Sequence, residues 1–176
     1  AMIFSDYTEE SMENFDAVLA NYGVERTDGI VIEGDSQHYA QMPYYLVPTV
    51  NSTDAISDFA SKGYYVLMPY AQGIKQTDNL RDTVTVNSLL TTSDSAYSKV
   101  DVNSGSIDKT DDDIDGPFDL GVSITETLDD DKETQIVYYT SSNLMDSQIN
   151  QMVSGGNEQM IMSSLNWMCS SDETST

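Results

Sequence analysis

The chain has very few of the residues that enzymes and metal proteins most often use for chemistry. Its 176 residues include one cysteine, Cys169, and one histidine, His38. A single cysteine cannot form an internal disulfide, which excludes a disulfide-stapled miniprotein. A zinc site needs three or four converging ligands, and a Cys–His catalytic pair would have to join residues from distant parts of the chain. We therefore expect His38 to lie in a surface loop, without a metal or catalytic role.

Positive charge and long apolar runs are also scarce. Seven Lys and Arg residues stand against thirty Asp and Glu residues, which gives a net charge of -23. A field of this sign repels phosphate backbones and anionic lipid head groups, so nucleic acid is excluded as a partner. No run approaches the roughly 18 consecutive apolar residues of a membrane helix, and no secretory signal opens the sequence. Most of the acidic residues are expected to form a solvated surface.

Known catalytic and nucleotide-binding motifs are missing as well. There is no G-x-S-x-G nucleophile elbow, no G-x-G-x-x-G fingerprint and no P-loop. Gly155 and Gly156 begin a predicted helix and could offer N–H groups to an anion, but a plain turn is favoured in such acidic surroundings. We predict no catalytic residues and no cofactor.

The apolar pattern does predict an α/β chain. Met2–Phe4 is a short apolar run, the segment 9–22 has helical spacing and ends at Gly23, and Ile30–Ile32 reads as a buried strand. This alternation favours a mainly parallel sheet with crossover helices. Further strands are expected at 64–68, 83–92, 118–125 and 134–139, the last two forming a hairpin, and further helices at 54–60, at 143–152 and from 155 onward.

Two stretches interrupt this pattern. Residues 36–53 form a long excursion rich in tyrosine, and residues 94–116 are polar and dense in aspartate, as in a mobile surface loop. Open parallel sheets bind ligands beyond the carboxyl ends of their strands. That rule predicts a possible ligand surface at Asp6, Ser93, Thr140 and Ser141, and the excursion predicts a possible recognition surface at Tyr39, Tyr44 and Tyr45.

One aspartate series resembles a calcium loop. Asp111, Asp113, Asp115, Gly116 and Asp119 match positions 1, 3, 5, 6 and 9 of an EF-hand loop. Position 12, which requires a bidentate glutamate, falls on Val122, and a strand follows where a helix is needed. A solvated acidic loop is therefore favoured, and Asp111, Asp113 and Asp115 are only weak candidates for metal ligands.

Several phrases occur together and in order along the chain. They are NFDAVLANYGV from Asn14, IVIE from Ile30, LLTTS from Leu89, GPFDLGVSI from Gly116, QIVYYTSS from Gln135 and GGNEQMIMSSLNWM from Gly155. Together they resemble the extracytoplasmic domain of auxiliary proteins of ABC-2 type transporters, the group that includes GldG-like gliding-motility proteins. The resemblance runs from about Ile3 to Met168. It implies a Rossmann-like or amidotransferase-like three-layer α/β sandwich, without the amidotransferase nucleophile, working beside a permease and an ATPase.

The resemblance also bears on organisation and location. It implies one α/β domain over residues 1–169, and the Ser, Asp and Thr residues of 170–176 predict a disordered tail. A strand begins almost at the first residue, so the chain is expected to be a fragment cut from a larger protein. In the family it resembles, the domain begins with additional strands and helices, so the resemblance implies that this chain is the C-terminal part of such a domain in a membrane protein. It would be attached to the membrane by segments outside this chain and lie on the extracytoplasmic face of the cell membrane.

Three functions remain open at this point. The first is a non-catalytic auxiliary domain of an ABC-type transport system that binds partner subunits or cargo. The second is a carbohydrate- or peptide-binding module of a surface protein, using the tyrosine-rich excursion. The third is a degenerate amidotransferase-like hydrolase, which the missing Cys–His pair disfavours.

Overall fold

The computed structural model describes residues 1–78, 80–128 and 132–170. Most of its regular structure is strand. The strands are β1 (Met2–Phe4), β2 (Val24–Arg26), β3 (Ile30–Ile32), β4 (Tyr45–Leu46), β5 (Thr49–Val50), β6 (Met68–Pro69), β7 (Ile74–Gln76), β8 (Val84–Thr91), β9 (Tyr97–Lys99), β10 (Ile114–Asp115), β11 (Asp119–Thr127) and β12 (Glu133–Tyr139). The helices are α1 (Glu13–Asn21), α2 (Ser57–Ala60), α3 (Ser147–Met152) and α4 (Gly156–Ser170), with 3-10 turns η1 (Asp54–Ile56), η2 (Val102–Ser104) and η3 (Ser142–Met145). The tail predicted to be disordered lies outside the described residues, except for Ser170 at the end of α4.

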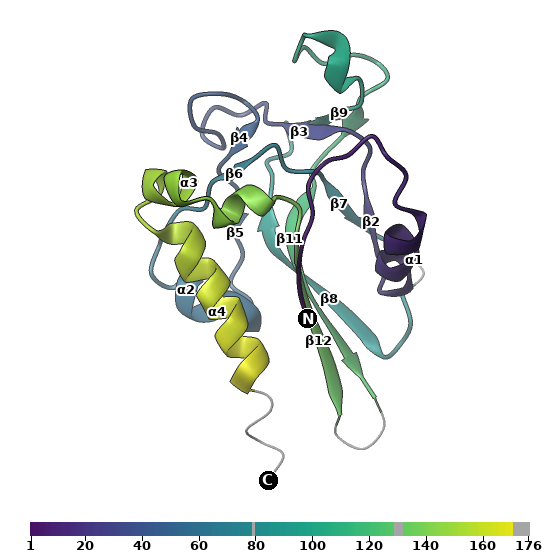
Figure 1. Cartoon of the computed structure of the whole chain (residues 1–176), viewed down its shortest axis with the longest axis vertical. Helices are drawn as coiled ribbons and strands as arrows, with labels where there is room; N and C mark the ends of the chain where they lie inside the picture. Colours follow the sequence, from purple (N-terminus) through teal and green to yellow (C-terminus); the bar gives the residue numbers. More distant parts are fainter. Residues whose placement is uncertain (79, 129–131, 171–176) are drawn as a thin grey trace.

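A seven-stranded sheet forms the centre of the molecule (Figure 1). Its main path is β1-β12-β11-β7-β2, and β8 pairs with β11 and with β5. Strands β1 and β12 run parallel, whereas the other pairs of this sheet are antiparallel. The prediction of a Rossmann-like or amidotransferase-like fold with a mainly parallel sheet is therefore wrong.

The path of the chain after α1 explains this difference. The chain returns through β2, which pairs antiparallel with β7, and β3 leaves the main sheet to pair with β9. The sequence order of strand, helix and strand was correct for β1, α1 and β3, but these strands lie in different sheets and form no parallel crossover unit. The predicted hairpin is confirmed, with β11 and β12 paired antiparallel from Gly121 opposite Tyr139 to Thr127 opposite Glu133.

Two small sheets lie beyond one end of the main sheet. The first has the order β10-β9-β3, and the second pairs β4 with β6. The segment 94–116, predicted to be a mobile loop, thus contributes two strands to the first small sheet. The predicted strand 64–68 is also wrong for most of its length, since only Met68 belongs to a strand.

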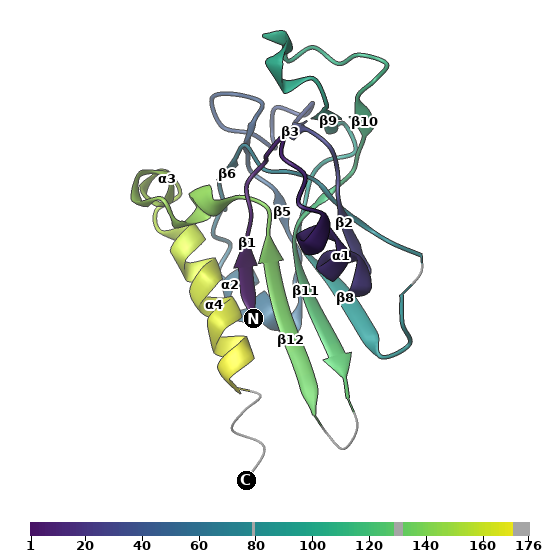
Figure 2. The same ribbon diagram turned by 45° about the vertical axis from the view of Figure 1, so that its right-hand side comes forward.

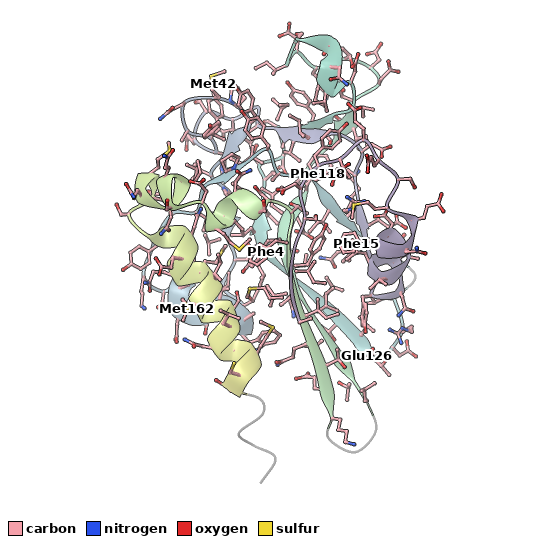
Figure 3. The ribbon with its side chains drawn as sticks, viewed as in Figure 1. Phe4, Phe15, Met42, Phe118, Glu126 and Met162 are labelled. Carbon is pink, nitrogen blue, oxygen red and sulfur yellow. The ribbon has the colours of Figure 1, made fainter. Side chains whose placement is uncertain are left out.

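Both faces of the main sheet are covered, by different helices. Figures 1 and 2 show α2 and α4 on one face and α1 on the other. The core on the α4 side includes Leu90, Val137 and Tyr139, and the core on the α1 side includes Val122 and Tyr138. Figure 3 shows Phe4 directed toward α4 and Phe15 lying between α1 and the sheet. The alternation of side chains along β12 therefore supplies both cores at once.

Gly121 makes room for an aromatic ring at the middle of the sheet. A Cβ atom at this position would lie 2.6 Å from Cδ1 of Tyr139, its partner on β12. The Tyr139 ring stacks on Phe4 with centroids 5.7 Å apart, and its hydroxyl is 2.8 Å from the Ser164 hydroxyl of α4. Burial raises the pKa of Tyr139, so the phenol stays neutral in this contact. This contact fixes α4 against the sheet.

Asn157 fastens the start of α4 to the segment that precedes β6. Its side chain is fully buried, accepts a hydrogen bond from the N–H of Leu67 and donates one to the Leu67 carbonyl, both at 2.9 Å. Gly156 lets the two backbones approach, because a Cβ there would lie 2.0 Å from the Tyr65 carbonyl oxygen. An asparagine side chain thus replaces a neighbouring strand as the partner of Leu67.

We expect Asn157→Ala to lower the free energy of unfolding by about 2 to 4 kcal/mol, because it leaves the buried N–H and C=O of Leu67 without partners. Asn166→Ala, at an exposed position of the same helix, is the matched control and should change it by less than about 0.5 kcal/mol. Chemical denaturation measures both. Equal effects of the two substitutions would contradict the assigned role.

The negative charge is only partly neutralised within the fold. The described residues contain four ion pairs, Arg26–Asp16, Arg81–Glu126, Lys99–Asp113 and Lys109–Asp115. Seven cationic side chains cannot balance thirty acidic ones. The folded state therefore retains strong repulsion among its carboxylates.

Thermal unfolding should accordingly shift to higher temperature as sodium chloride rises from about 0.01 to about 1 M, since the screening length falls from about 30 to about 3 Å. Sucrose at matched osmolarity is the control, because it separates the screening of charge by salt from the stabilisation caused by a solute that is excluded from the protein surface. A midpoint that is constant or falls with salt would show that repulsion does not limit stability.

Candidate ligand-binding cleft

A cleft of about 740 Å³ opens at the end of the main sheet where the two small sheets lie. Its walls come from segments far apart in the sequence, namely the turn after β1, β3, the loop before β4, the residue after β6, the loop after β9 and η3. Met42, labelled in Figure 3, lies at one rim. We call it the aromatic cleft; it is lined by Asp6, Tyr7, Ile30, Met42, Tyr44, Tyr70, Val102, Gly105, Ser106, Ile107 and Asn143.

Two stacked tyrosines form one wall of the aromatic cleft. The rings of Tyr44 and Tyr70 are nearly parallel, at 18°, with centroids 4.9 Å apart. Tyr45 supports both, with centroids 5.7 Å from Tyr44 and 5.9 Å from Tyr70. Tyr70 is 45% exposed and has a positive φ of 55°, an uncommon conformation for a residue with a large side chain. Burial and the adjoining Tyr44 and Tyr45 raise the pKa of Tyr70, so its phenol is uncharged at neutral pH.

The carboxylate and the amide side chain of the aromatic cleft come from the turn after β1 and from η3. Asp6 accepts hydrogen bonds from the backbone N–H of Ser142 at 2.8 Å and from its hydroxyl at 2.5 Å. Asn143 donates to the carbonyl of Pro69 at 3.4 Å. Because β1 and β12 are parallel neighbours, the residues that come after them meet at one edge of the sheet. This fixes the Asp6 carboxylate at the rim.

The opposite wall is the loop between β9 and β10, and a buried ion pair holds it. The Lys99 ammonium lies 3.0 Å from Oδ2 of Asp113 and donates to the carbonyl of Asp108 at 2.8 Å. Their side chains are only 4% and 1% exposed. The Tyr97 hydroxyl also donates to the carbonyl of Ile107, a residue of the cleft. The wall is therefore fixed from behind.

Asp113 is the centre of this support. Burial opposes its ionisation, but hydrogen bonds from the backbone of Thr110, from Lys99, from the backbone of Val100 and from the Thr110 hydroxyl outweigh burial. They lower the pKa of Asp113 to about 2. The carboxylate is thus held ionised as a structural acceptor.

The three aspartates considered as calcium ligands do not converge. Asp113 is engaged by Lys99, Asp115 pairs with Lys109, and Asp111 is exposed. Nowhere in the described ranges do three His, Cys, Asp or Glu side chains gather in a way that could hold a metal ion.

The predicted ligand surface divides into three groups. Asp6 and Tyr44 line the aromatic cleft, and Tyr45 lies against its tyrosine wall. Three hydroxyls hold the fold: Thr140 donates to the carbonyl of Leu120, Ser141 to that of Pro69, and Ser93 to the buried carboxylate of Glu33. Tyr39 forms an isolated bridge with Leu46 and is not among the lining residues.

Sequence reasoning missed several residues of the aromatic cleft. Three of them, Met42, Tyr70 and Ile107, are exposed large hydrophobic residues. The pair Tyr44 and Tyr45 gave a hint that aromatic residues gather here, but Tyr70 reaches the wall through an unusual backbone conformation that its sequence does not signal. Ile107 lies in a stretch that was read as a solvated loop.

A second cleft lies beside the first, and the segment 6–10 is part of the wall of both. It measures about 570 Å³. We call it the acidic cleft; it is lined by Thr8, Glu9, Glu10, Ser11, Met12, Asp16, Ala17, Ala20, Glu25, Arg26, Asp28 and Gln72.

Among the described residues that line the aromatic cleft, none is Lys, Arg, His or Cys. Ring faces, amide and carboxylate groups suit the aromatic cleft to holding a ligand.

Comparison with known proteins gives information on the fold alone. No family model matches the chain, and no curated protein matches it. Among solved structures, the chain is similar to the "mmIFT52 N-terminal domain", with a TM-score of 0.59 and 12% sequence identity over 94% of this chain. The chain spans 63% of the length of that neighbour. The likeness is to this domain and not to a Rossmann-like protein, in agreement with the antiparallel topology.

We expect acid to weaken the contacts of Asp113 that hold the loop between β9 and β10. Asp113 ionises more readily in the folded state, with its pKa at about 2, than in an unfolded chain, where it is near 3.9. The stabilisation that the ionised Asp113 carboxylate gives to the folded loop is therefore complete above about pH 4 and is lost as the pH falls through about 2. Hydrogen exchange at the amides of Val100 and Thr110 should show this loss of protection.

Asp113→Asn should remove that protection already at neutral pH. Asp115→Asn, which changes an exposed pair, is the control and should retain it. Protection at Val100 that is the same in Asp113→Asn and in the unaltered chain would contradict the role of the carboxylate.

Proposed function

We propose that the chain is a non-catalytic binding domain that serves as an auxiliary part of an ABC-type transport system. In this proposal it works on the extracytoplasmic face of the membrane, beside the permease and ATPase subunits, and is attached through segments outside this chain. The ordered set of phrases that resembles ABC-2 type auxiliary proteins supports the transport setting. None of the described helices has the length and apolarity that a membrane crossing requires.

The observation that carries the proposal is the aromatic cleft. Its size lies within the range of about 300 to 1,000 Å³ that is typical of ligand sites, and its walls are mostly apolar with a few placed polar groups. The hydroxyl of Ser106, the one serine among the described lining residues, donates to Asp108, and no imidazole or amine lies among those residues to activate it. The groups present favour recognition over turnover.

A second candidate function is a carbohydrate- or peptide-binding module of a surface protein. The stacked pair Tyr44 and Tyr70, beside the polar groups of Asp6 and Asn143, favours it. Aromatic faces bind the apolar side of a ligand while carboxylate and amide groups orient its polar atoms. In this case the ligand would be bound without any transport subunit.

Photo-crosslinking in native membranes distinguishes the two functions. The full-length protein would carry p-benzoylphenylalanine in place of Met42 at the rim of the aromatic cleft, or in place of Asp58 on α2 as the control position. We expect adducts with the permease of an ABC-type system, identified by mass spectrometry, from position 42 and not from position 58. Adducts that contain no transport subunit would overturn the transport proposal.

Tyr70→Gly tests whether the aromatic cleft itself is responsible. Glycine tolerates the positive φ of this position, so the substitution removes the ring without straining the backbone. The position-42 adduct should fall about tenfold, as for the loss of one aromatic contact of about 1.4 kcal/mol. Ser154→Gly, at another positive φ of 54° between α3 and α4, is the matched control and should leave the adduct unchanged.

A further inference from the structure

The two adjoining clefts differ in chemistry, and both lack available positive charge. The acidic cleft has five carboxylates, from Glu9, Glu10, Asp16, Glu25 and Asp28, and a single cation, Arg26. The aromatic cleft adds the carboxylate of Asp6 on the other side of the shared segment 6–10. A ligand that extends across this segment would contact ring faces at one end and carboxylates at the other.

Arg26 is already neutralised by its own neighbours. Its guanidinium lies 2.8 Å from Asp16, donates to the Gln72 side chain at 3.2 Å and stands over the Phe15 ring at 5.4 Å. Its side chain is 8% exposed. Arg26 and Asp16 neutralise each other. The acidic cleft therefore has a net negative charge, to which Glu10, Glu25 and Asp28 contribute.

The basic residues near the aromatic cleft are neutralised in the same way. Lys99 is buried against Asp113 behind the loop wall, and Lys109 pairs with Asp115. Tyr7, at the junction of the two clefts, is affected by the negative electrostatic field of the nearby carboxylates. Burial, together with the charges of Glu9, Asp28 and Asp101, raises the pKa of Tyr7.

The junction of the clefts is held in place. The side chain of Asn103, in η2, donates to Glu9 of the shared segment at 2.5 Å. The Thr8 hydroxyl accepts the N–H of Glu10 at 3.1 Å. The Asn103 bond therefore joins the loop wall to the segment 6–10 beside the carboxylates of Glu9 and Glu10.

We infer that the two clefts together bind a basic peptide segment, with an apolar side chain against Tyr44 and Tyr70 and lysine or arginine side chains toward Glu10 and Asp28. This ligand class rests on the proposed binding function and makes it specific. Ammonium and guanidinium groups are favoured beside both carboxylates and tyrosine faces. An acidic segment would be repelled by the clefts and by the net charge of -23.

Calorimetric titration of the chain with three capped tetrapeptides tests this inference. The probes are acetyl-Phe-Arg-Leu-Arg-amide, the same peptide with citrulline in place of arginine, and the same peptide with glutamate in place of arginine. Citrulline keeps the shape and hydrogen bonding of arginine without its charge. At about 50 mM salt the arginine peptide should bind at least about tenfold more tightly than the citrulline peptide, and about 500 mM salt should reduce this difference.

Charge variants assign the effect to the acidic cleft. Glu10→Gln combined with Asp28→Asn should weaken the arginine peptide by about fivefold and leave the citrulline peptide unchanged. Asp54→Asn combined with Asp58→Asn removes the same charge from η1 and α2 and should have no effect beyond about twofold. Circular dichroism melts confirm that each variant is folded before titration.

Three outcomes would overturn the inference. They are equal binding of the arginine and citrulline peptides, tighter binding of the glutamate peptide, and binding of a neutral probe such as chitotetraose in the aromatic cleft when the arginine peptide does not bind. In each case the crosslinks that depend on Tyr70 would still test the proposed function separately. If the arginine peptide binds but no adducts with the permease form at position 42, the transport proposal would be rejected. The inference that the clefts bind a basic peptide would then still stand.

Discussion

Burial of β11 on both faces is the constraint on which the other elements depend. This strand lies between β12 on one side and β8 and β7 on the other, and its residues from Leu120 to Ile124 are all buried. Its side chains therefore need a helix layer on each face. Irregular pairing with β8 around Gly121 places Leu120 in the core on the α4 side and Val122 in the core on the α1 side.

The aromatic cleft is a consequence of how the main sheet ends. At this end the neighbouring strands belong to other sheets, since β9 pairs with β3 and β10, and β4 pairs with β6. The cleft beside these small sheets is lined by side chains from the turn after β1 and from the loop between β9 and β10, which Lys99 supports. The hydroxyls of Thr140 and Ser141 complete backbone hydrogen bonding at the sheet end. The ring faces and the Asp6 carboxylate, which also accepts hydrogen bonds from Ser142, line the cleft.

Some of the fold and of the cleft could be predicted, for identifiable reasons. Short apolar runs located β1, β3, β8, β11 and β12, and the spacing of hydrophobic residues located α4. The prediction failed at 64–68, because the backbone partner of Leu67 is the side chain of Asn157, some ninety residues away. It also placed the start of the first helix at Glu9, whereas α1 begins at Glu13 and Thr8 instead accepts the N–H of Glu10.

Composition and apolar spacing by themselves determined the net charge, five of the twelve strands and the hairpin of β11 and β12. These properties depend on local periodicity and on summed charge, which do not require knowledge of distant neighbours. Strand direction, the pairing of β2 with β7, and the meeting of Asp6, Tyr44, Tyr70 and Ile107 in one cleft were decided only by the tertiary structure. They depend on which strand edges and ring faces meet across long stretches of chain, and such contacts leave no pattern in the local sequence.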